Sequence, residues 1–183
     1  MNNLISQRRS IFPAQFSKDE IAKHTIEKLI EAANWAPTHR KTEPWRFKVF
    51  QNRAKESLGE QLVQAYKITA SKFSATKANK IAIKVDQSAA VIAICMQRDP
   101  EALVPEWEEI AATAMAVQNL WLCATDLGLG GYWSSPSFAN QINTFLDLAA
   151  GERCLGFFYL GYYEGPTPQR QPSPWQDKVR WFE

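Results

Sequence analysis

The sequence predicts an α+β fold, in which helices pack against a central sheet and the C-terminal segment forms an ordered, extended arm. Two apolar runs, residues 89–95 and 154–163, have the β-branched and aromatic character of buried strands. Between them, residues 105–127 place apolar side chains at helical spacing around nearly the whole helix. A helix this apolar belongs in the middle of a protein, so we expect it to share one core with the two strands.

The other helices are each indicated by a local pattern. Residues 17–20 read Ser-Lys-Asp-Glu, which is a capping box and predicts that a helix begins at Ser17. This helix should end near Trp35, because the Ala-Pro junction that follows disfavours a further turn. Two more segments are amphipathic and predict helices, over residues 55–72 and 138–148, and a basic segment around residues 77–84 predicts another helix.

Two shorter segments complete the predicted sheet. Residues 46–50 alternate between polar and apolar side chains and are typical of a strand. Gly128 suits the position just after the end of the central helix. The sequence Gly-Gly-Tyr-Trp-Ser-Ser that follows then predicts another short strand or turn.

The last eighteen or so residues are rich in proline, which excludes a long helix or a central strand there. The same segment carries apolar side chains that disordered tails rarely have: Trp175, Val179, Trp181 and Phe182. We therefore expect an extended arm that lies against a hydrophobic surface. No repeat or linker divides the chain, so residues 1–183 are expected to form one domain.

The composition excludes several classes of protein. A net charge of +2 is too small for a typical nucleic-acid or membrane-surface binder. No apolar run approaches the length that spans a bilayer. The three cysteines, Cys95, Cys123 and Cys154, lie in apolar stretches without short spacing, which predicts reduced thiols in a cytoplasmic protein.

Arg8, Arg9 and Ser10 stand side by side near the start of the chain, which suggests an export signal, a solvated surface pair or an anion site. An export signal requires an apolar stretch after the basic residues, whereas here Pro13 and then charged residues follow. Paired guanidinium groups with a hydroxyl suit a phosphate, but exposed arginine pairs often bind nothing. The spacing alone leaves these two interpretations open.

The sequence gives no support for several common kinds of catalytic or cofactor site. The two histidines, His24 and His39, have no partner at metal-ligand spacing, and no Gly-x-Ser-x-Gly elbow is present. The glycine-rich residues 128–131 follow a helix and enter a strand, the reverse of the order in a dinucleotide-binding motif. We therefore assign no catalytic side chain and no metal ligand.

Three further loops are rich in groups that bind anions or flat rings. They are residues 36–45 (Ala-Pro-Thr-His-Arg-Lys-Thr-Glu-Pro-Trp), residues 128–135, and the segment around Arg170. Glycine permits close approach of the backbone to a flat ligand, and Trp133 can pack against a ring. A phosphate-bearing cofactor and a purely structural role both fit this pattern.

Taken together, these segments resemble the nitroreductase family of FMN flavoproteins, close to its small bacterial members. The resemblance runs essentially from end to end, and the order of Ala-Pro…Pro-Trp followed by Gly-x-Gly-Gly-x-Trp is its most specific part. It implies a nitroreductase-like α+β fold with a mostly antiparallel central sheet. It also implies a homodimer with two FMN sites at the subunit interface, each built from both chains.

The resemblance also implies roles for individual residues. One chain would hold the phosphate and ribityl chain of FMN through Arg8, Arg9, Ser10 and Arg170, and line the flavin with Trp133, Ser134 and Ser135. Trp35, Thr38 and His39 would reach the same flavin from the other subunit. The backbone amides of Gly130 and Gly131 would lie near the flavin N5, and residues 126–131 would contact the nicotinamide.

The implied reaction passes a hydride from NAD(P)H through FMN to an acceptor such as a nitroaromatic or a quinone. A specialised flavin-dependent dehydrogenase or dehalogenase, a non-enzymatic FMN-binding protein, and a structural module remain alternatives. Two residues depart from the family pattern: Glu43 stands where relatives often have Gln, and Trp35 where a polar or basic residue is frequent. These departures leave the substrate preference open.

Overall fold

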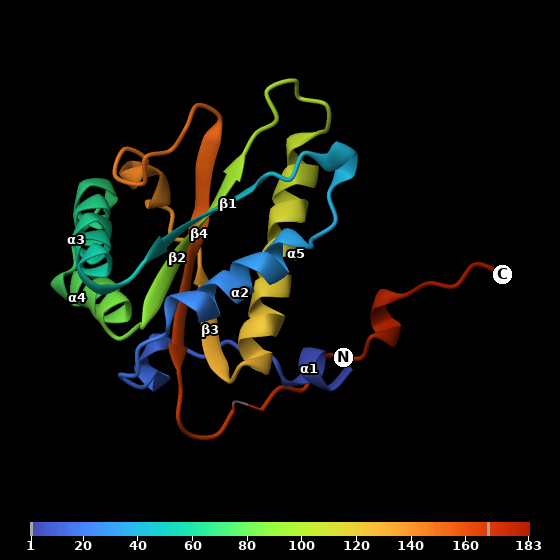
Figure 1. The fold of residues 1–183 in the computed structure, drawn as a ribbon, viewed down its shortest axis with the longest axis horizontal. Helices are drawn as coiled ribbons and strands as arrows, with labels where there is room; N and C mark the ends of the chain where they lie inside the picture. The colour runs from blue at the N-terminus through green and yellow to red at the C-terminus, as the bar shows by residue number, and fades with distance from the viewer. Residues whose placement is uncertain (1, 168) are drawn as a thin grey trace.

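A computed structural model describes residues 2–167 and 169–183. Its centre is a four-stranded sheet in the order β1-β2-β4-β3, in which every pair of neighbours is antiparallel (Figure 1). The strands are β1 (Trp45–Phe50), β2 (Ala90–Gln97), β3 (Leu129–Ser134) and β4 (Glu152–Tyr162). The predicted α+β fold with a mostly antiparallel sheet is confirmed.

Helices cover both faces of this sheet. The helices are α1 (Asn2–Gln7), α2 (Lys23–Asn34), α3 (Asn52–Thr69), α4 (Ala75–Asp86) and α5 (Glu106–Asp126). Figure 1 shows α3 and α4 together on one side of the strands and α2 and α5 on the other. Short 3-10 turns lie at Pro13–Gln15, His39–Lys41, Ala139–Ile142 and Gln176–Lys178.

The continuous apolar run of β2 is explained by these two layers. Ile92 and Ile94 pack into the cluster formed with α2 and α5, whereas Val91 and Cys95 pack into the cluster formed with α3 and α4. Every residue from Ala90 to Met96 is buried. Because alternate side chains of a strand point to opposite faces, a strand covered on both faces needs apolar residues throughout.

The central helix agrees with its prediction. Residues predicted as 105–127 form α5, with Ala116 and Leu120 fully buried against the sheet and α2. Leu127 is the C-cap, and Gly128 follows with φ of 73°, a left-handed conformation that glycine adopts without strain. The glycine therefore ends the helix and lets the chain turn directly into β3.

The predicted capping box at Ser17 is wrong. The helix begins at Lys23 with Ala22 as its N-cap, and the Ser17 hydroxyl bonds locally to Asp19 instead. The backbone amide of Ser17 donates to the carbonyl of Tyr162 at 2.7 Å, so this segment lies along the sheet. Tertiary pairing, together with burial of Ile21, prevails over the local capping signal.

The predicted helix over residues 138–148 is also wrong in type. The segment forms a 3-10 turn over Ala139–Ile142 and then irregular turns, with Asp147 at a φ of 49°. Its apolar side chains are nevertheless buried against the α3/α4 side of the sheet, as the amphipathic pattern implies. Asn143 and Thr144 are weak helix formers whose side chains compete for backbone hydrogen bonds, which favours turns.

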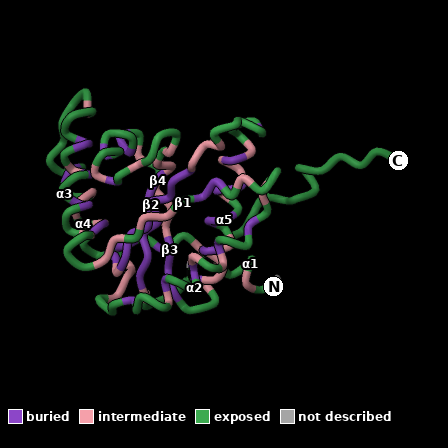
Figure 2. The backbone as a smooth tube through the Cα atoms, turned by 45° about the horizontal axis from the view of Figure 1, so that its top comes forward, coloured by how far each residue is buried: buried purple, intermediate pink, exposed green. Residues whose placement is uncertain are grey.

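The C-terminal arm is extended, as predicted, but its own chain does not cover it. Beyond β4 the chain runs away from the sheet and past α1 into solvent (Figures 1 and 2). Trp175, Trp181 and Phe182 are all exposed, Phe182 to 84%. The hydrophobic surface expected beneath the arm is therefore not offered by the described part of the same chain.

Candidate functional site

Three arginines meet beside the start of β3. Arg8 and Arg9 follow α1, and Arg170 reaches them from the C-terminal arm. Partial burial lowers the pKa of Arg8 most, and the positive charges of Arg170 and Arg9 lower it further. Repulsion of this kind would be relieved by an anion with several oxygens, such as a phosphate.

The guanidinium of Arg8 lies over the ring of Trp121 on α5, 4.4 Å from the ring centre. This contact places the Arg8 side chain next to Trp121 along α5, and it is a favourable cation–π arrangement. The indole N–H of Trp121 is buried and finds no hydrogen-bond partner within the residues that the structure describes. Arg8 is thus held by its flat face, which leaves the edge of the guanidinium to donate hydrogen bonds.

Ser10 lies on the free edge of the sheet. β3 is an edge strand, and residues 10 and 11 run parallel to it, with the amide of Ile11 donating to the carbonyl of Gly131 at 3.0 Å. This pairing brings Arg8 and Arg9 to the edge of β3. The resemblance assigned Arg8, Arg9 and Ser10 to one phosphate site, and the pairing with β3 keeps these three residues together at the edge of the sheet.

Gly130 and Gly131 are both buried, and their neighbours occupy the space that a side chain would need. A Cβ atom at Gly130 would lie 2.9 Å from Ile11 and Phe16, and one at Gly131 would overlap the ring of Phe158. Close packing against the N-terminal segment and β4 is therefore a sufficient reason for both glycines. On the side where a Cβ atom would lie, the neighbouring side chains leave no room for a ligand.

Trp133, Ser134 and Ser135 lie at the far end of β3. The Trp133 ring packs against Gly156 of β4, and its indole N–H is buried without a partner in the described residues. Ser134 ends the strand and Ser135 is exposed beyond it. A hollow in the protein surface therefore lies directly after the end of this edge strand.

This hollow is a pocket of about 310 Å³ between α4 and the end of β3. Ser134, Pro136, Ser137 and Tyr159 form one wall, and three lysines of α4, Lys77, Lys80 and Lys84, form the other. No acidic side chain is among the described residues that line it. The basic helix expected around residues 77–84 is thus part of the pocket, a role that the sequence did not predict, although a spacing of three and four residues places the lysines on one helix face.

An aromatic pair joins the arginine end of the site to the pocket. Phe12 packs on Tyr132 at a ring-centre distance of 4.5 Å, and the ammonium of Lys84 lies 5.3 Å from the centre of the same Tyr132 ring. Gly131, next to Ser10, and Ser134, at the pocket, are about 10 Å apart along the strand. Arg8 lies over Trp121 on the α2/α5 face of the sheet and the pocket lies on the α3/α4 face, so a ligand that reaches both has to pass around the edge of the sheet at β3.

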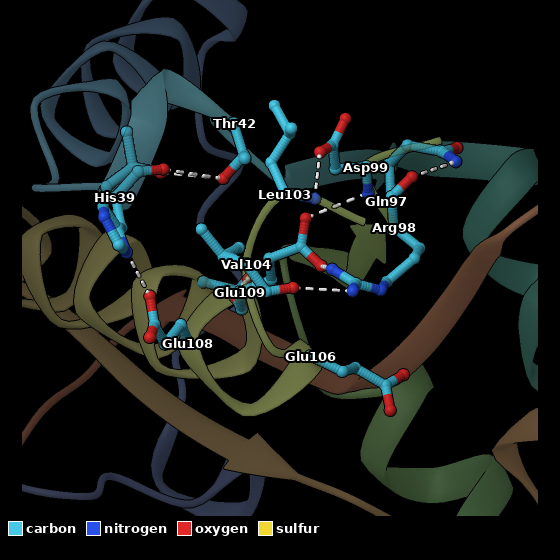
Figure 3. A network of polar contacts seen from close by, with 12 residues as sticks. His39, Thr42, Gln97, Arg98, Asp99, Leu103, Val104, Glu106, Glu108 and Glu109 are labelled. Carbon is cyan, nitrogen blue, oxygen red and sulfur yellow. Dashed lines mark hydrogen bonds and ion pairs between the residues drawn. The ribbon is translucent and has the colours of Figure 1, made fainter. Parts of the chain in front are cut away.

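Trp35, Thr38 and His39 lie elsewhere in the chain. Trp35 is 82% exposed at the end of α2, and the Thr38 hydroxyl bonds with that of Thr42. The His39 ring bonds through Nδ1 to the Glu108 carboxylate at 2.6 Å (Figure 3). Glu108 and Trp121 are about 20 Å apart along α5, so His39 lies far from Arg8 within one chain.

A buried ion pair fixes the helix end that carries Glu108. Glu109 is only 1% exposed and accepts hydrogen bonds from the Arg98 guanidinium and from the amide of Asp99 (Figure 3). Arg98 also donates to the carbonyl of Val104. The loop between β2 and α5 is thereby tied to the first turn of α5, which holds Glu108 in place for His39.

The described residues offer neither a metal site nor a membrane span. Over residues 2–167 and 169–183, no group of three or more His, Cys, Asp or Glu side chains is placed to hold a metal ion. Within the same described stretches, no helix is both long and apolar enough to span a membrane.

Comparison with known proteins shows the class to which the chain belongs. The sequence profile of the Nitroreductase family matches residues 5–162, so the chain is a member of that family. This confirms the resemblance found in the sequence.

Individual relatives agree with this membership over nearly the full length. The chain is 25% identical to the Bacillus subtilis protein named "Putative NAD(P)H nitroreductase YfhC", over 97% of this chain and 92% of that one. A nitroreductase-like family protein from Bacillus cereus has a TM-score of 0.88 at 25% identity and covers 100% of this chain and 95% of its own.

A more distant structure shares the fold. The FMN-dependent nitroreductase NfnB from Mycobacterium smegmatis, solved in complex with NADPH, has a TM-score of 0.77 at 16% identity. That alignment covers 100% of this chain and 97% of NfnB.

Proposed function

We propose that the protein is an FMN-dependent NAD(P)H oxidoreductase that reduces nitroaromatic or quinone-type acceptors. The observation that supports this most strongly is the arrangement along β3, with three arginines at one end and a basic pocket at the other. FMN has a matching shape, a phosphate joined to a flat ring by a flexible chain. Membership of the Nitroreductase family supports the same cofactor.

The phosphate end suits this chain's own residues. Arg8 lies against Trp121, Arg9 donates through Nη1 to the carbonyls of Ser6 and Arg8, and Arg170 adds a third guanidinium nearby. The hydroxyl of exposed Ser10 adds a further donor. Burial, and then repulsion from Arg170 and Arg9, lower the pKa of Arg8, and a dianionic phosphate would offset that repulsion. These residues therefore form the proposed phosphate site.

The ring end is proposed to be the lysine pocket, which Ser134 lines, whereas Trp133 packs on the α2/α5 face of the sheet and Ser135 follows at the strand end. A volume of about 310 Å³ is at the small end of ligand pockets, which suits partial enclosure of a flavin by one chain. Lysine ammonium groups on the pocket wall favour negative charge near the ring, and charge close to a flavin ring tunes its electronics. The resemblance assigned the flavin N5 donors to the amides of Gly130 and Gly131; we infer that the backbone after Ser134 is a further candidate, because Ser134, Pro136 and Ser137 line the pocket.

The remaining wall is proposed to come from a second copy of the chain. Trp35 is 82% exposed and His39 lies about 20 Å along α5 from the arginines, so neither completes the site of its own chain. The exposed aromatic side chains of the arm need a partner surface as well. A homodimer would bring Trp35, Thr38 and His39 of one protomer to the flavin of the other.

When bound, FMN would accept a hydride from NAD(P)H and then pass it to an acceptor that takes the place of the oxidised nucleotide. The protein's part is to hold the phosphate, position the ring at the end of β3 and exclude water. No side chain in this arrangement is required as an acid or base. The free cysteines fit a reducing compartment, and we propose the cytoplasm.

The first test is the visible absorption spectrum of the purified protein, followed by anaerobic addition of NADPH or NADH. Flavin bands that bleach, and that return on addition of a nitroaromatic or quinone, are the expected result. Bands that persist with both nucleotides would instead favour an FMN-binding protein without this activity. No bands after incubation with FMN would remove the proposed cofactor altogether.

A further inference from the structure

Two of the three cysteines are direct neighbours in the sheet. Cys95 of β2 and Cys154 of β4 are partners in the antiparallel register. Both side chains pack in the cluster on the α3/α4 face. The sequence alone gives no sign of this pairing, because the two residues lie far apart in the chain and only the strand register brings them together.

The Cys154 thiol donates a hydrogen bond to the carbonyl of Gly156 at 3.5 Å, and the Cys95 thiol is its neighbour across the strand pair. Interaction with the neighbouring Cys154 thiol, together with burial, raises the pKa of Cys95. The interaction with Cys95 lowers the pKa of Cys154, although burial acts in the opposite direction. Since the thiolate is the reactive form of cysteine, Cys154 is the more nucleophilic member of the pair.

The strand geometry permits a covalent bond between them. Residues directly opposite each other in an antiparallel pair have Cα atoms about 4.5–5.5 Å apart. Disulfides span Cα distances of about 4.4–6.8 Å, so the ranges overlap. The register also shifts between Ile94 and Cys95, and a bulge of this kind gives the backbone room to adjust.

Access to the pair is one-sided. Cys95 is fully buried, whereas Cys154 is partly exposed. The Lys48–Glu152 ion pair, 3.2 Å between nitrogen and oxygen, flanks the two thiols. An oxidant that enters from solvent therefore meets Cys154 first and finds Cys95 behind it.

We propose that Cys95 and Cys154 are a site of reversible oxidation, which forms an intramolecular disulfide when the protein meets a hydroperoxide. The Cys154 thiolate attacks one peroxide oxygen, the O–O bond breaks, and an alcohol (water, from hydrogen peroxide) leaves after taking up a proton. Cys154 is then a sulfenic acid. The Cys95 sulfur attacks the Cys154 sulfur, the S–O bond breaks, and the released hydroxide takes the Cys95 proton to form water.

In total, two thiols and one hydroperoxide give one disulfide, one alcohol and one water. The two electrons lost by the sulfur atoms reduce the peroxide bond. A dithiol reductant reverses the oxidation by thiol–disulfide exchange and is itself left as a disulfide. The site differs from the flavin site and does not depend on it.

The disulfide would act next to the proposed ring pocket. Cys154 lies two residues before Gly156, against which the Ser134 carbonyl and the Trp133 ring pack. A bond from Cys154 to Cys95 fixes this part of β4 to β2. It also closes a long loop of the chain, which restricts the unfolded state and raises the melting temperature.

The test treats the full-length protein with hydrogen peroxide under native conditions, then denatures it and alkylates free thiols. We expect a single alkylated cysteine, a mass lower by two hydrogens before alkylation, and a peptide pair that joins Cys95 to Cys154. Dithiothreitol should restore three alkylated thiols. Cys123→Ala is the matched control, because the third thiol lies on α5, and it should form the same disulfide.

Two variants test the order of events. In Cys95→Ala, peroxide should leave a sulfenic acid at Cys154 that dimedone captures, and in Cys154→Ala the buried Cys95 should resist oxidation. The proposal is overturned if the peroxide-treated native protein keeps three alkylatable thiols. It is equally overturned if the cross-link contains Cys123. The wild-type peptide map decides the matter even where a variant fails to fold.

Discussion

Gly156 leaves no room for a side chain beside Ser134. A Cβ atom at Gly156 would overlap the Ser134 carbonyl oxygen and lie 2.7 Å from the Trp133 indole nitrogen. The glycine also has a φ of +139°, which other residues rarely adopt. The bulge of β4 at Gly156 therefore allows the end of β3 to approach closely, and it is this approach that sets the wall of the proposed ring pocket.

The first prediction concerns Gly156→Ala. We expect it to reduce the free energy of unfolding by about 2–6 kcal/mol, because backbone strain and overpacking each cost about 1–3 kcal/mol. It should also weaken FMN binding, since Ser134 must move away from Gly156. Urea denaturation and a flavin titration measure the two effects.

Gly165→Ala is the control for this change. Gly165 also has a positive φ, of +99°, but a Cβ atom there would have no described neighbour within 4 Å. Only the backbone cost of about 1–3 kcal/mol therefore applies. Equal losses of unfolding free energy in Gly156→Ala and Gly165→Ala would show that contact with Ser134 does not contribute to the destabilisation.

The second prediction concerns the proposed phosphate site. Arg8→Gln should weaken FMN binding tenfold or more, because a charge-assisted hydrogen bond contributes about 1.5–3 kcal/mol. The flavin-free protein should change by less than about 1 kcal/mol, since the lost contact with Trp121 is offset by weaker repulsion from Arg9 and Arg170. Flavin fluorescence titration measures the affinity and calorimetry the stability.

Arg153→Gln removes one positive charge elsewhere and serves as the control. Arg153 forms an exposed pair with Glu106, 3.0 Å between nitrogen and oxygen, away from the arginine cluster. Its loss should leave FMN affinity unchanged at constant ionic strength. If both variants bind FMN equally well, Arg8 does not hold the phosphate.

Much of the fold could be predicted from the sequence, because local pattern and tertiary packing agree in most elements. The apolar run of β2 and the apolar surface of α5 each require burial, and both are buried. The pattern failed at Ser17, where a bond to the Tyr162 carbonyl outweighs a capping box. It also failed around Asn143, where burial of apolar side chains does not require a regular helix.

The site could be predicted only in part. The arginines near residue 8 and Arg170 belong to opposite ends of the chain, and the resemblance, not the spacing, brought them together. The basic helix around Lys77 to Lys84 was predicted but not its place in the pocket, because lysines at helical spacing usually mark a solvated face. The Cys95–Cys154 pair depends on a register shift in the sheet, and no pattern in one strand can reveal the register of its neighbour.

The third prediction concerns the ion pair behind Glu108. Glu109→Ala should reduce the free energy of unfolding by about 3–5 kcal/mol, because it removes one partner of a buried pair and leaves Arg98 without its carboxylate. Urea denaturation of the flavin-free protein provides the measurement. Glu106→Ala, in an exposed pair one turn earlier, should cost no more than about 1 kcal/mol. Similar losses of unfolding free energy in the two variants would mean that burial does not increase the contribution of the Glu109 ion pair to stability.

The fourth prediction is a pH dependence from Tyr159. Burial raises the pKa of Tyr159 above its usual value of 10.0, and nearby Tyr132 raises it further. The folded protein therefore keeps this proton at a pH where the unfolded chain releases it, so stability is present below pH 10.0 and falls as pH rises above it. The loss should approach about 1.4 kcal/mol per pH unit.

Tyr159→Phe should remove this part of the alkaline loss, as measured by urea denaturation at several pH values from neutral to alkaline. Tyr163→Phe, after the end of β4, is the control and should keep the wild-type slope. An unchanged slope in Tyr159→Phe would show that another group governs the alkaline limb.

The fifth prediction concerns the C-terminal arm and the proposed dimer. Trp175, Trp181 and Phe182 are exposed in the single chain, and a partner chain is the surface that we expect to cover them. Replacing all three with Ala should convert a dimer to a monomer in light scattering and should reduce FMN binding, because Trp35 and His39 of the partner would then be absent. Gln176→Ala with Lys178→Ala changes polar residues of the same arm and should leave the dimer intact. A wild-type monomer that binds FMN would contradict the shared site, whereas a triple variant that remains dimeric would show that the arm is not what holds the two chains together.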